Sequence, residues 1–231
     1  GSKMHTILTI DTSSTHCTVA LLLSDVLLER VSESQRQSAQ RVLPMISELL
    51  LDAKIQISDI DLIAVVAGPG SFTGVRIGVA VAQGLSLSAG IPAVPLSSLA
   101  LSALATVSQS SFDRVLVSEK AREGELYFAA YQCSERQGVE LVGREQVALI
   151  EDFDALPEDL AGTSWCLAGS GWERQSEILQ HLQCTATAAP QTPVIDNQLI
   201  AKLALLRFNC SEAVEAAALR PNYVKEQLDY T

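Results

Sequence analysis

The chain has 231 residues, which is enough for one large domain or for two domains of roughly 100 residues each. Its formal net charge of −11 leaves no basic surplus with which to neutralise a nucleic-acid backbone over a wide face. The five cysteines are scattered without a C-x-x-C pair, which favours reduced thiols over a disulfide framework or a zinc site. Charged residues make up only 19% and hydrophobic residues 48%, a balance that indicates a surface buried against a partner.

No part of the sequence resembles a membrane or secretion signal. Residues 1–3 resemble the remnant of an expression tag, and the segment from Met4 carries no basic region followed by an apolar core. No apolar run reaches the ~18 residues of a membrane-spanning helix. We therefore expect a cytoplasmic protein without a membrane partner.

The first half of the chain predicts three strands, followed by helices and strands in alternation. The expected elements are strands at 7–10, 17–23 and 26–31, a helix over 40–53, a buried strand at 62–68, a helix over 75–87, and a strand and a helix within 91–107. Pro44 is tolerable only if it falls in the first turn of its helix. Leu43 and Leu51 lie off the apolar stripe of that helix, so it is apolar on more than one side.

The polar segment 108–113 breaks the hydrophobic pattern and predicts a domain boundary. The elements expected beyond it are strands at 114–120, 125–133 and 139–149, a strand and glycine turn at 165–171, a helix over 173–182, a loop over 184–195, a helix over 197–208, and the tail "LRPNYVKEQ" at 219–227. This order predicts an α/β architecture with mixed sheets.

The stretch "AGPGSFTGVRIG", residues 67 to 78, joins a strand to a helix through glycines and hydroxyl residues. It matches neither the P-loop G-x-x-x-x-G-K-[ST] nor the dinucleotide loop G-x-G-x-x-G. Ser71 or Thr73 is placed to cap the helix. Two readings stay open, because the turn could serve packing alone or could offer free N–H groups and a helix dipole to an anion.

Two further turns are candidates for contacts with a nucleotide. In "IDTSST", Asp11 ends a strand, so its carboxylate could hold magnesium through water while Thr12 and Ser13 face phosphate oxygens. The alternative is that these residues merely suit a turn. In "LAGSGW", Gly169 and Gly171 could admit a flat ring close to the backbone, although tight packing explains the glycines equally well.

No residue pattern predicts a metal site or a catalytic group. The histidines at 5, 16 and 181 have no second ligand at zinc-site spacing. Ser71 lacks the G-x-S-x-G elbow and has no obvious base. The sequence therefore predicts no catalytic and no metal-binding residue.

Several motifs together resemble the TsaB family, also called YeaZ. They occur in the family's order and spacing, and they are "ILTIDTSSTHCTVALL", "RVLPMISELL", "GPGSFTGVRIGVAVAQGLS", "PLSSLALSALA", "AREGELYFAAY", "AGSGW" and "LRPNYVKEQ". The resemblance implies the actin-like, Hsp70-like ATPase (ASKHA) fold with two lobes of mixed sheets flanked by helices. The expected lobes are 4–107 plus 196–220 and 108–195, because the last helix returns to the first lobe.

The resemblance implies a role in tRNA modification. The family works with TsaD and the ATPase TsaE, which together place the threonylcarbamoyl group from threonylcarbamoyl-AMP on N6 of the adenosine beside the anticodon, in tRNAs reading codons that begin with A. TsaD carries the metal and the transfer chemistry, whereas TsaB is implied to be a non-catalytic scaffold and activator. The implied partners are TsaD, TsaE and a second copy of the chain, with tRNA met only through the complex. No cofactor is assigned, and ATP or ADP is a candidate at the interface with TsaD.

The resemblance also implies that helices of the first lobe form the partner surface. In TsaD the metal histidines fall in the region that here reads "RQSAQRVLPMI", without a histidine. The expected interface residues are Leu43, Met45, Ile46, Leu50, Phe72, Val75, Arg76, Val79 and Gln83. On this reading, Val79→Glu or Leu50→Arg abolishes partner association and leaves the fold intact. An interface of standard size would bury about 800 Å² per side.

One position departs from the family's pattern. Where relatives commonly have Asp-Ala-Arg, this chain has Lys120-Ala121-Arg122. A carboxylate there helps the actin-like fold to hold a metal–nucleotide complex, so the lysine lowers the expectation of independent ATP hydrolysis. The rival hypotheses are an autonomous ATPase or small-molecule phosphotransferase of the same fold, favoured by Asp11, and a metallopeptidase, disfavoured by the missing histidine motif.

Overall fold

A computed structural model describes residues 5–224, and the chain divides into two compact units. The first unit is Gly1–Ser98 with Asp196–Asn222, and the second is Leu99–Ile195 with Tyr223–Thr231. The last helix of the chain thus lies in the first unit. The boundary lies at Ser98/Leu99 rather than after 107, because helix α3 (Ser98–Ser108) follows its strand without a loop and belongs to the second unit. The predicted tag remnant 1–3 lies outside the described residues.

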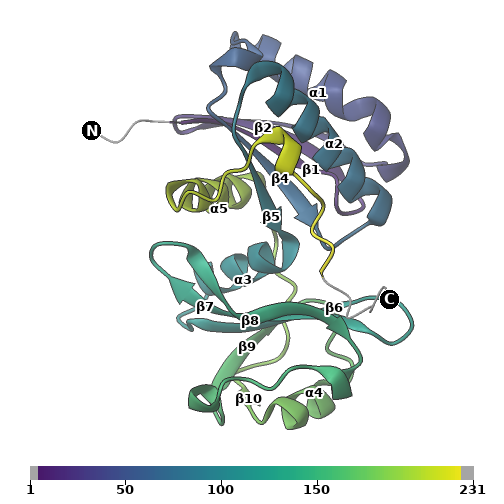
Figure 1. Ribbon diagram of the computed structural model, residues 1–231, viewed down its shortest axis with the longest axis vertical. Coiled ribbons are helices and arrows are strands. Elements are labelled where there is room, and N and C mark those ends of the chain that lie inside the picture. The colour runs from purple at the N-terminus through teal and green to yellow at the C-terminus, as the bar shows by residue number, and fades with distance from the viewer. Residues whose placement is uncertain (1–4, 225–231) are drawn as a thin grey trace. The chain divides into compact units, whose positions relative to one another are not determined.

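The first unit is a five-stranded mixed sheet between two helical layers (Figure 1). Its strands are β1 (Thr6–Asp11), β2 (Cys17–Leu23), β3 (Val26–Ser32), β4 (Leu62–Gly68) and β5 (Ala93–Ser97), in the spatial order β3-β2-β1-β4-β5. The first three strands are antiparallel, and β4 and β5 run parallel to β1. Every residue of β4 is buried, as expected for a parallel strand covered on both faces.

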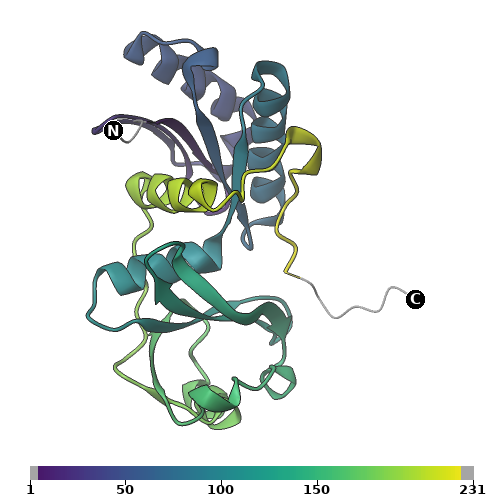
Figure 2. The same cartoon turned by 60° about the vertical axis from the view of Figure 1, so that its left-hand side comes forward.

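Helices α1 (Ser38–Ala53) and α2 (Phe72–Ala89) pack side by side on one face of this sheet, and α5 (Asn197–Asn209) covers the other (Figures 1 and 2). A buried amide fixes α5 to the sheet. Asn197 Oδ1 accepts a hydrogen bond from Thr9 Oγ1 at 3.1 Å, and Asn197 Nδ2 donates to Glu29 Oε1 at 2.9 Å. Strands β1 and β3 therefore both hold the start of α5.

Helix α1 begins at Ser38, two residues earlier than its apolar pattern predicts, so Pro44 lies in its second turn. The condition that Pro44 falls in the first turn is therefore wrong. Proline within a helix costs about 3 kcal/mol. The helix persists because burial of its inner stripe outweighs that cost; the buried apolar residues are Val42, Met45, Ile46 and Leu49.

The second unit holds a sheet in the order β10-β9-β6-β7-β8. Its elements are β6 (Arg114–Lys120), β7 (Leu126–Ser134), β8 (Gly138–Ala148), β9 (Ser164–Ala168), α4 (Gln175–Leu182) and β10 (Thr185–Ala186). The predicted strands and helix are confirmed, but β10 falls in the predicted loop 184–195. The rings of Phe128 and Phe153 stack within the core of this unit, with their centroids 4.6 Å apart. Short 3-10 turns connect the elements of both units: η1 (Gln35–Gln37), η2 (Ile57–Asp59), η3 (Ile150–Asp152), η4 (Glu158–Leu160) and η5 (Ala216–Ala218).

Both units have the same topology. Strands β1, β2 and β3 form an antiparallel meander, and β4 and β5 are added parallel on the other side of β1. Strands β6, β7 and β8 form the equivalent meander, and β9 and β10 are added beyond β6 in the same way. The chain therefore repeats one five-strand unit, although the sequence shows no repeat of fixed short period.

Candidate functional site

The first candidate site is the turn that follows β1. Asp11 Oδ1 accepts hydrogen bonds from the backbone N–H of Ser13 at 2.9 Å and from its hydroxyl at 2.5 Å. Burial raises the pKa of Asp11, and the two bonds from Ser13 oppose that rise. The neighbouring Thr12 is buried, and its hydroxyl donates to the carbonyl of Gly74. The three predicted nucleotide residues of this turn are thus brought together, but they bond to the protein itself.

The glycine turn after β4 closes against the same place. A Cβ added at Gly70 would lie 2.6 Å from the carbonyl oxygen of Ser13, so only glycine fits this approach. The backbone N–H of Ser71 donates to that carbonyl at 2.9 Å, and the Ser71 hydroxyl accepts from the N–H of Gly74 at 3.2 Å. The predicted capping role of Ser71 is confirmed. The geometry supports the packing reading of the turn 67–74, because its N–H groups at Ser71 and Gly74 already have acceptors.

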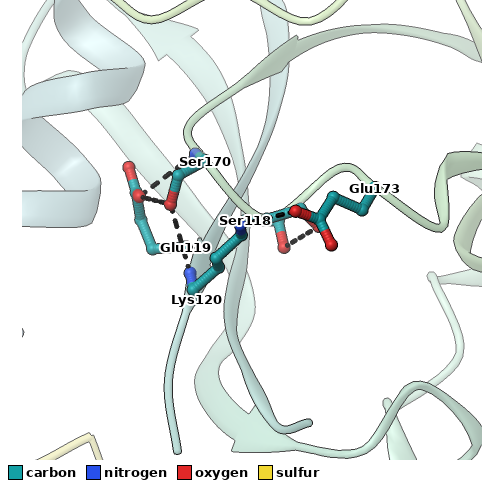
Figure 3. A network of polar contacts seen from close by, with 6 residues as sticks. Ser118, Glu119, Lys120, Ser170 and Glu173 are labelled. Carbon is teal, nitrogen blue, oxygen red and sulfur yellow. Dashed lines mark hydrogen bonds and ion pairs between the residues drawn. The ribbon is translucent and has the colours of Figure 1, made fainter.

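The second unit has an equivalent pair of turns, at the ends of β6 and β9 (Figure 3). The N–H of Gly171 donates to the carbonyl of Ser118 at 2.9 Å, and a Cβ at Gly169 would collide with that same oxygen. Glu119 Oε2 accepts from the backbone N–H of Ser170 at 3.1 Å and from its hydroxyl at 2.5 Å. Tight packing, rather than room for a flat ring, therefore accounts for Gly169 and Gly171.

The two units share one arrangement of a carboxylate and a serine at their strand-end turns. In each, a carboxylate at the end of the first strand accepts both the N–H and the hydroxyl of one serine, Ser13 for Asp11 and Ser170 for Glu119. The serine belongs to the hairpin turn in the first unit and to the opposing glycine turn in the second. Each carboxylate therefore accepts two hydrogen bonds from its own chain, which are of the strong charge-assisted kind.

Lys120, which stands where relatives commonly have aspartate, pairs with an acidic side chain. Its ammonium forms an exposed ion pair with Glu173, with Nζ and Oε1 2.6 Å apart, and this contact lowers the pKa of Glu173 (Figure 3).

Within residues 5–224, no group of three or more His, Cys, Asp or Glu side chains could hold a metal ion. Nor does any helix in this described range combine the length and apolarity needed to cross a bilayer.

The second candidate site is the exposed side of α1 and α2. Leu43, Phe72 and Arg76 are exposed as predicted, and the Arg76 guanidinium lies over the Phe72 ring, 3.7 Å from its centroid. Leu51 and Leu87 are also exposed, at 78% and 76%, and were not among the predicted interface residues. The signal for Leu51 was its place off the apolar stripe, next to Leu43 at i and i+8.

Other predicted interface residues are not on the surface. Four of them lie in the hydrophobic core of the first unit and are at most 6% exposed: Met45, Ile46, Val75 and Val79. Their assignment to a partner surface is wrong, because they pack between the helices and their own sheet. Leu50 is partly buried against the same core, and Gln83 donates from its side-chain Nε2 to the carbonyl of Ala216 at 2.9 Å.

The repeated unit, with a strand-end carboxylate turn and an opposing glycine turn in each copy, defines a protein of the actin-like ATPase (ASKHA) fold class. A family model described as TsaD, tRNA N6-adenosine threonylcarbamoyltransferase, matches residues 25–203. The Escherichia coli protein named tRNA threonylcarbamoyladenosine biosynthesis protein TsaB is 36% identical over 172 residues, which is 74% of each chain.

Solved structures show the same relationship. A Pseudomonas aeruginosa protein described as similar to peptidase YeaZ is 35% identical, with a TM-score of 0.79 over 96% of this chain and 100% of its own. A second structure, described as YeaZ from Pseudomonas aeruginosa, is 33% identical, with a TM-score of 0.76 over 95% of this chain and 100% of its own. The chain belongs to the TsaB (YeaZ) family.

Proposed function

We propose that this protein is a non-catalytic scaffold subunit in the synthesis of threonylcarbamoyladenosine on tRNA, where it activates TsaD together with TsaE. Membership of the TsaB family supports the pathway. The observation that carries the scaffold role is the contrast between the two candidate sites. The strand-end turns are closed by the chain's own carboxylates, whereas α1 and α2 carry large apolar side chains exposed to solvent.

Each helix carries one stripe of exposed residues that includes its large exposed apolar side chains. On α1 the stripe passes through Leu43, Ser47 and Leu51, and on α2 through Phe72, Arg76, Ala80 and Leu87. We call these seven residues the docking face. Its apolar content with an aromatic–arginine pair matches the composition of protein interfaces, in which aromatic residues and arginine are enriched. Its occupant in the proposed complex is TsaD, or a second copy of the chain when TsaD is absent.

Reconstitution tests the proposal directly. Threonylcarbamoyl transfer to tRNA by TsaD and TsaE is measured with this subunit omitted, restored, and restored as Phe72→Ala or Leu43→Glu. We expect activity to require the subunit, and each variant to weaken association with TsaD by about 10- to 100-fold, as truncations at interface hot spots do.

A matched control separates docking from folding. Val31 on β3 is 55% exposed, close to the 51% of Leu43, but it lies outside the docking face. Val31→Glu should therefore leave association and activity unchanged. The scaffold proposal is contradicted if transfer proceeds equally well without the subunit. Hydrolysis of ATP by the purified chain alone, lost in Asp11→Asn, would instead favour the autonomous phosphotransferase.

A further inference from the structure

The motif "LRPNYV" near the C-terminus has no part in the proposed docking face, yet its first residues pack on the helix that carries that face. After α5, Val214 pairs with Ala93 at the free edge of β5, through N–H to carbonyl bonds of 2.8 and 3.3 Å. The chain then passes α2, where the carbonyl of Ala216 accepts from Gln83, and Leu219 is buried in the core of the first unit. We call residues 213–222 the C-terminal strap.

The strap ends on the glycine turn that begins α2. The backbone N–H of Asn222 donates to the carbonyl of Ala67 at 2.7 Å, and its side-chain Nδ2 donates to the carbonyl of Gly68 at 3.2 Å. The next carbonyl, that of Pro69, accepts from the hydroxyl of Ser98. Three successive carbonyls of this turn are therefore held by side chains or backbone from distant parts of the first unit.

This clamp lies directly before the docking face in the chain. Ser71 caps α2, Phe72 is its first residue, and Arg76 follows one turn later. The first turn of a helix has few internal hydrogen bonds, so its position depends on the groups that hold the preceding residues. A turn anchored at these three carbonyls presents Phe72 in one orientation, and a preorganised contact loses less entropy on binding than a mobile one.

We infer that the C-terminal strap, through Asn222, is a positioning element that holds the start of α2 in the orientation that a partner binds. The inference rests on the proposed docking role. Two residues of the strap make different contributions. Leu219 is buried in the apolar core, and Asn222 donates directional hydrogen bonds to the turn. The positioning role can therefore be tested separately from the stability that burial provides.

The test compares Asn222→Asp and Asn222→Ala with Glu215→Ala, an exposed position of the same strap. Neither replacement side chain can donate to the carbonyl of Gly68 at neutral pH. We expect amide hydrogen exchange at residues 71–76 to become at least 10-fold faster in both variants, with a melting temperature lowered by only a few degrees, and association with TsaD to weaken about 10-fold. Glu215→Ala should match the unmodified chain in all three measurements.

A second variant guards against loss of folding at Asn222. Gln83→Met keeps the length of the side chain and removes its bond to Ala216, so it loosens the strap from the side of α2. Unchanged exchange at 71–76 in the folded variants would overturn the inference, as would unchanged association. Exchange is measured without a partner, so a failure of the unmodified chain to bind TsaD would contradict the proposed function and leave the strap measurement standing.

Discussion

At the scale of single residues, the most informative groups are the two carboxylates that bond to a serine near them. Asp11 is partly buried and carries a raised pKa, and its two acceptor bonds to Ser13 do not restore the ordinary value. Glu119 makes the corresponding pair of bonds to Ser170. Both carboxylates therefore stabilise the turns beside them.

Replacing Asp11 by asparagine should increase stability at neutral pH. A pKa that is higher in the folded than in the unfolded state makes the folded protein favour the protonated form, so ionisation lowers stability as pH rises from the unfolded value through the folded one. The amide of the Asp11→Asn variant would keep an oxygen acceptor for the Ser13 N–H without a charge. Urea unfolding at pH 7 should show the gain, which should shrink at pH 4. A loss of stability at pH 7 would show that the ionised carboxylate is stabilising.

Cysteine reactivity should separate buried from exposed thiols. Burial raises the pKa of Cys184 to about 11, whereas Cys133 is exposed. The thiolate is the reactive form, and at pH 8 about one part in a thousand of Cys184 would carry it. Iodoacetamide should therefore modify Cys133 at least 100-fold faster, as mass spectrometry of peptides would show. Equal rates would mean that the region of Cys184 opens readily. As the control, the Cys133→Ser variant should lose the fast modification.

At the scale of elements, α2 is packed on two sides and exposed on a third. The sheet covers one side and the C-terminal strap another, and the remaining side, which includes Phe72 and Arg76, reaches solvent. Two glycines of α2 differ in the space around them, because Gly78 faces the packed side and Gly84 the exposed side. A Cβ at Gly78 would lie 2.5 Å from Thr12 Oγ1, whereas a Cβ at Gly84 would meet no atom within 4 Å.

The two glycines form a matched pair for mutation. Gly78→Ala should destabilise the protein by about 1–3 kcal/mol, because the added methyl group forces Thr12 and its turn to move. Gly84→Ala should stabilise it by about 0.5–1 kcal/mol through helix propensity alone. Denaturant unfolding of both variants measures the difference. If the two changes had the same sign, the close contact between α2 and the Thr12 turn would be refuted.

Neighbouring residues of α2 separate the core from the docking face. Val79 is 4% exposed, so Val79→Glu buries a charge and should unfold the first unit or cost several kcal/mol. This replaces the expectation from the sequence that Val79→Glu leaves the fold intact. Ala80 is exposed, and Ala80→Glu should fold normally and weaken partner association. Circular dichroism and size-exclusion with TsaD distinguish the two; a folded Val79→Glu chain would contradict the packing described above.

At the scale of the whole molecule, one topology occurs twice, and the chain has a large negative charge. A formal net charge of −11 repels a phosphate backbone at long range. The proposed complex therefore needs a partner to hold the tRNA. This agrees with the docking face, whose large side chains are mainly apolar and include one cation, Arg76.

The isolated chain should bind tRNA too weakly to detect at micromolar concentration and 150 mM salt. Few phosphate contacts are available, and each contact loses affinity as salt rises. Fluorescence anisotropy of labelled tRNA tests this, with the TsaD-containing complex as the positive control. Binding by the chain alone, with a salt dependence equivalent to several phosphate contacts, would require a basic surface that the charge balance does not suggest.

Most elements could be predicted from the sequence because their signals are local. The apolar run at β4 and the turn with its Ser71 cap needed only neighbouring residues to be recognised. The start of α1 was predicted two residues too late, because Pro44 was expected in the first turn of the helix. In the structure Pro44 lies in the second turn. The short strand β10 was missed because two residues carry no periodicity.

The candidate interface could be predicted only in part. A helix that is apolar nearly all round, such as α2, does not show which side faces its own sheet and which faces a partner. Phe72 and Arg76 were correctly expected at the surface, but Val75 and Val79 were placed there wrongly. The strap contact at Gln83 joins residues 133 positions apart, and no local pattern encodes it.

The sequence by itself determined the order of the elements, the charge, the lack of paired histidine ligands and the resemblance to a family, because these depend on residue identity and short-range spacing. Only the tertiary structure decided that the strand-end turns bond to the chain's own carboxylates, and which apolar side chains remain exposed. Both depend on contacts between segments far apart in the chain, where burial and hydrogen bonding are set by what packs against each residue.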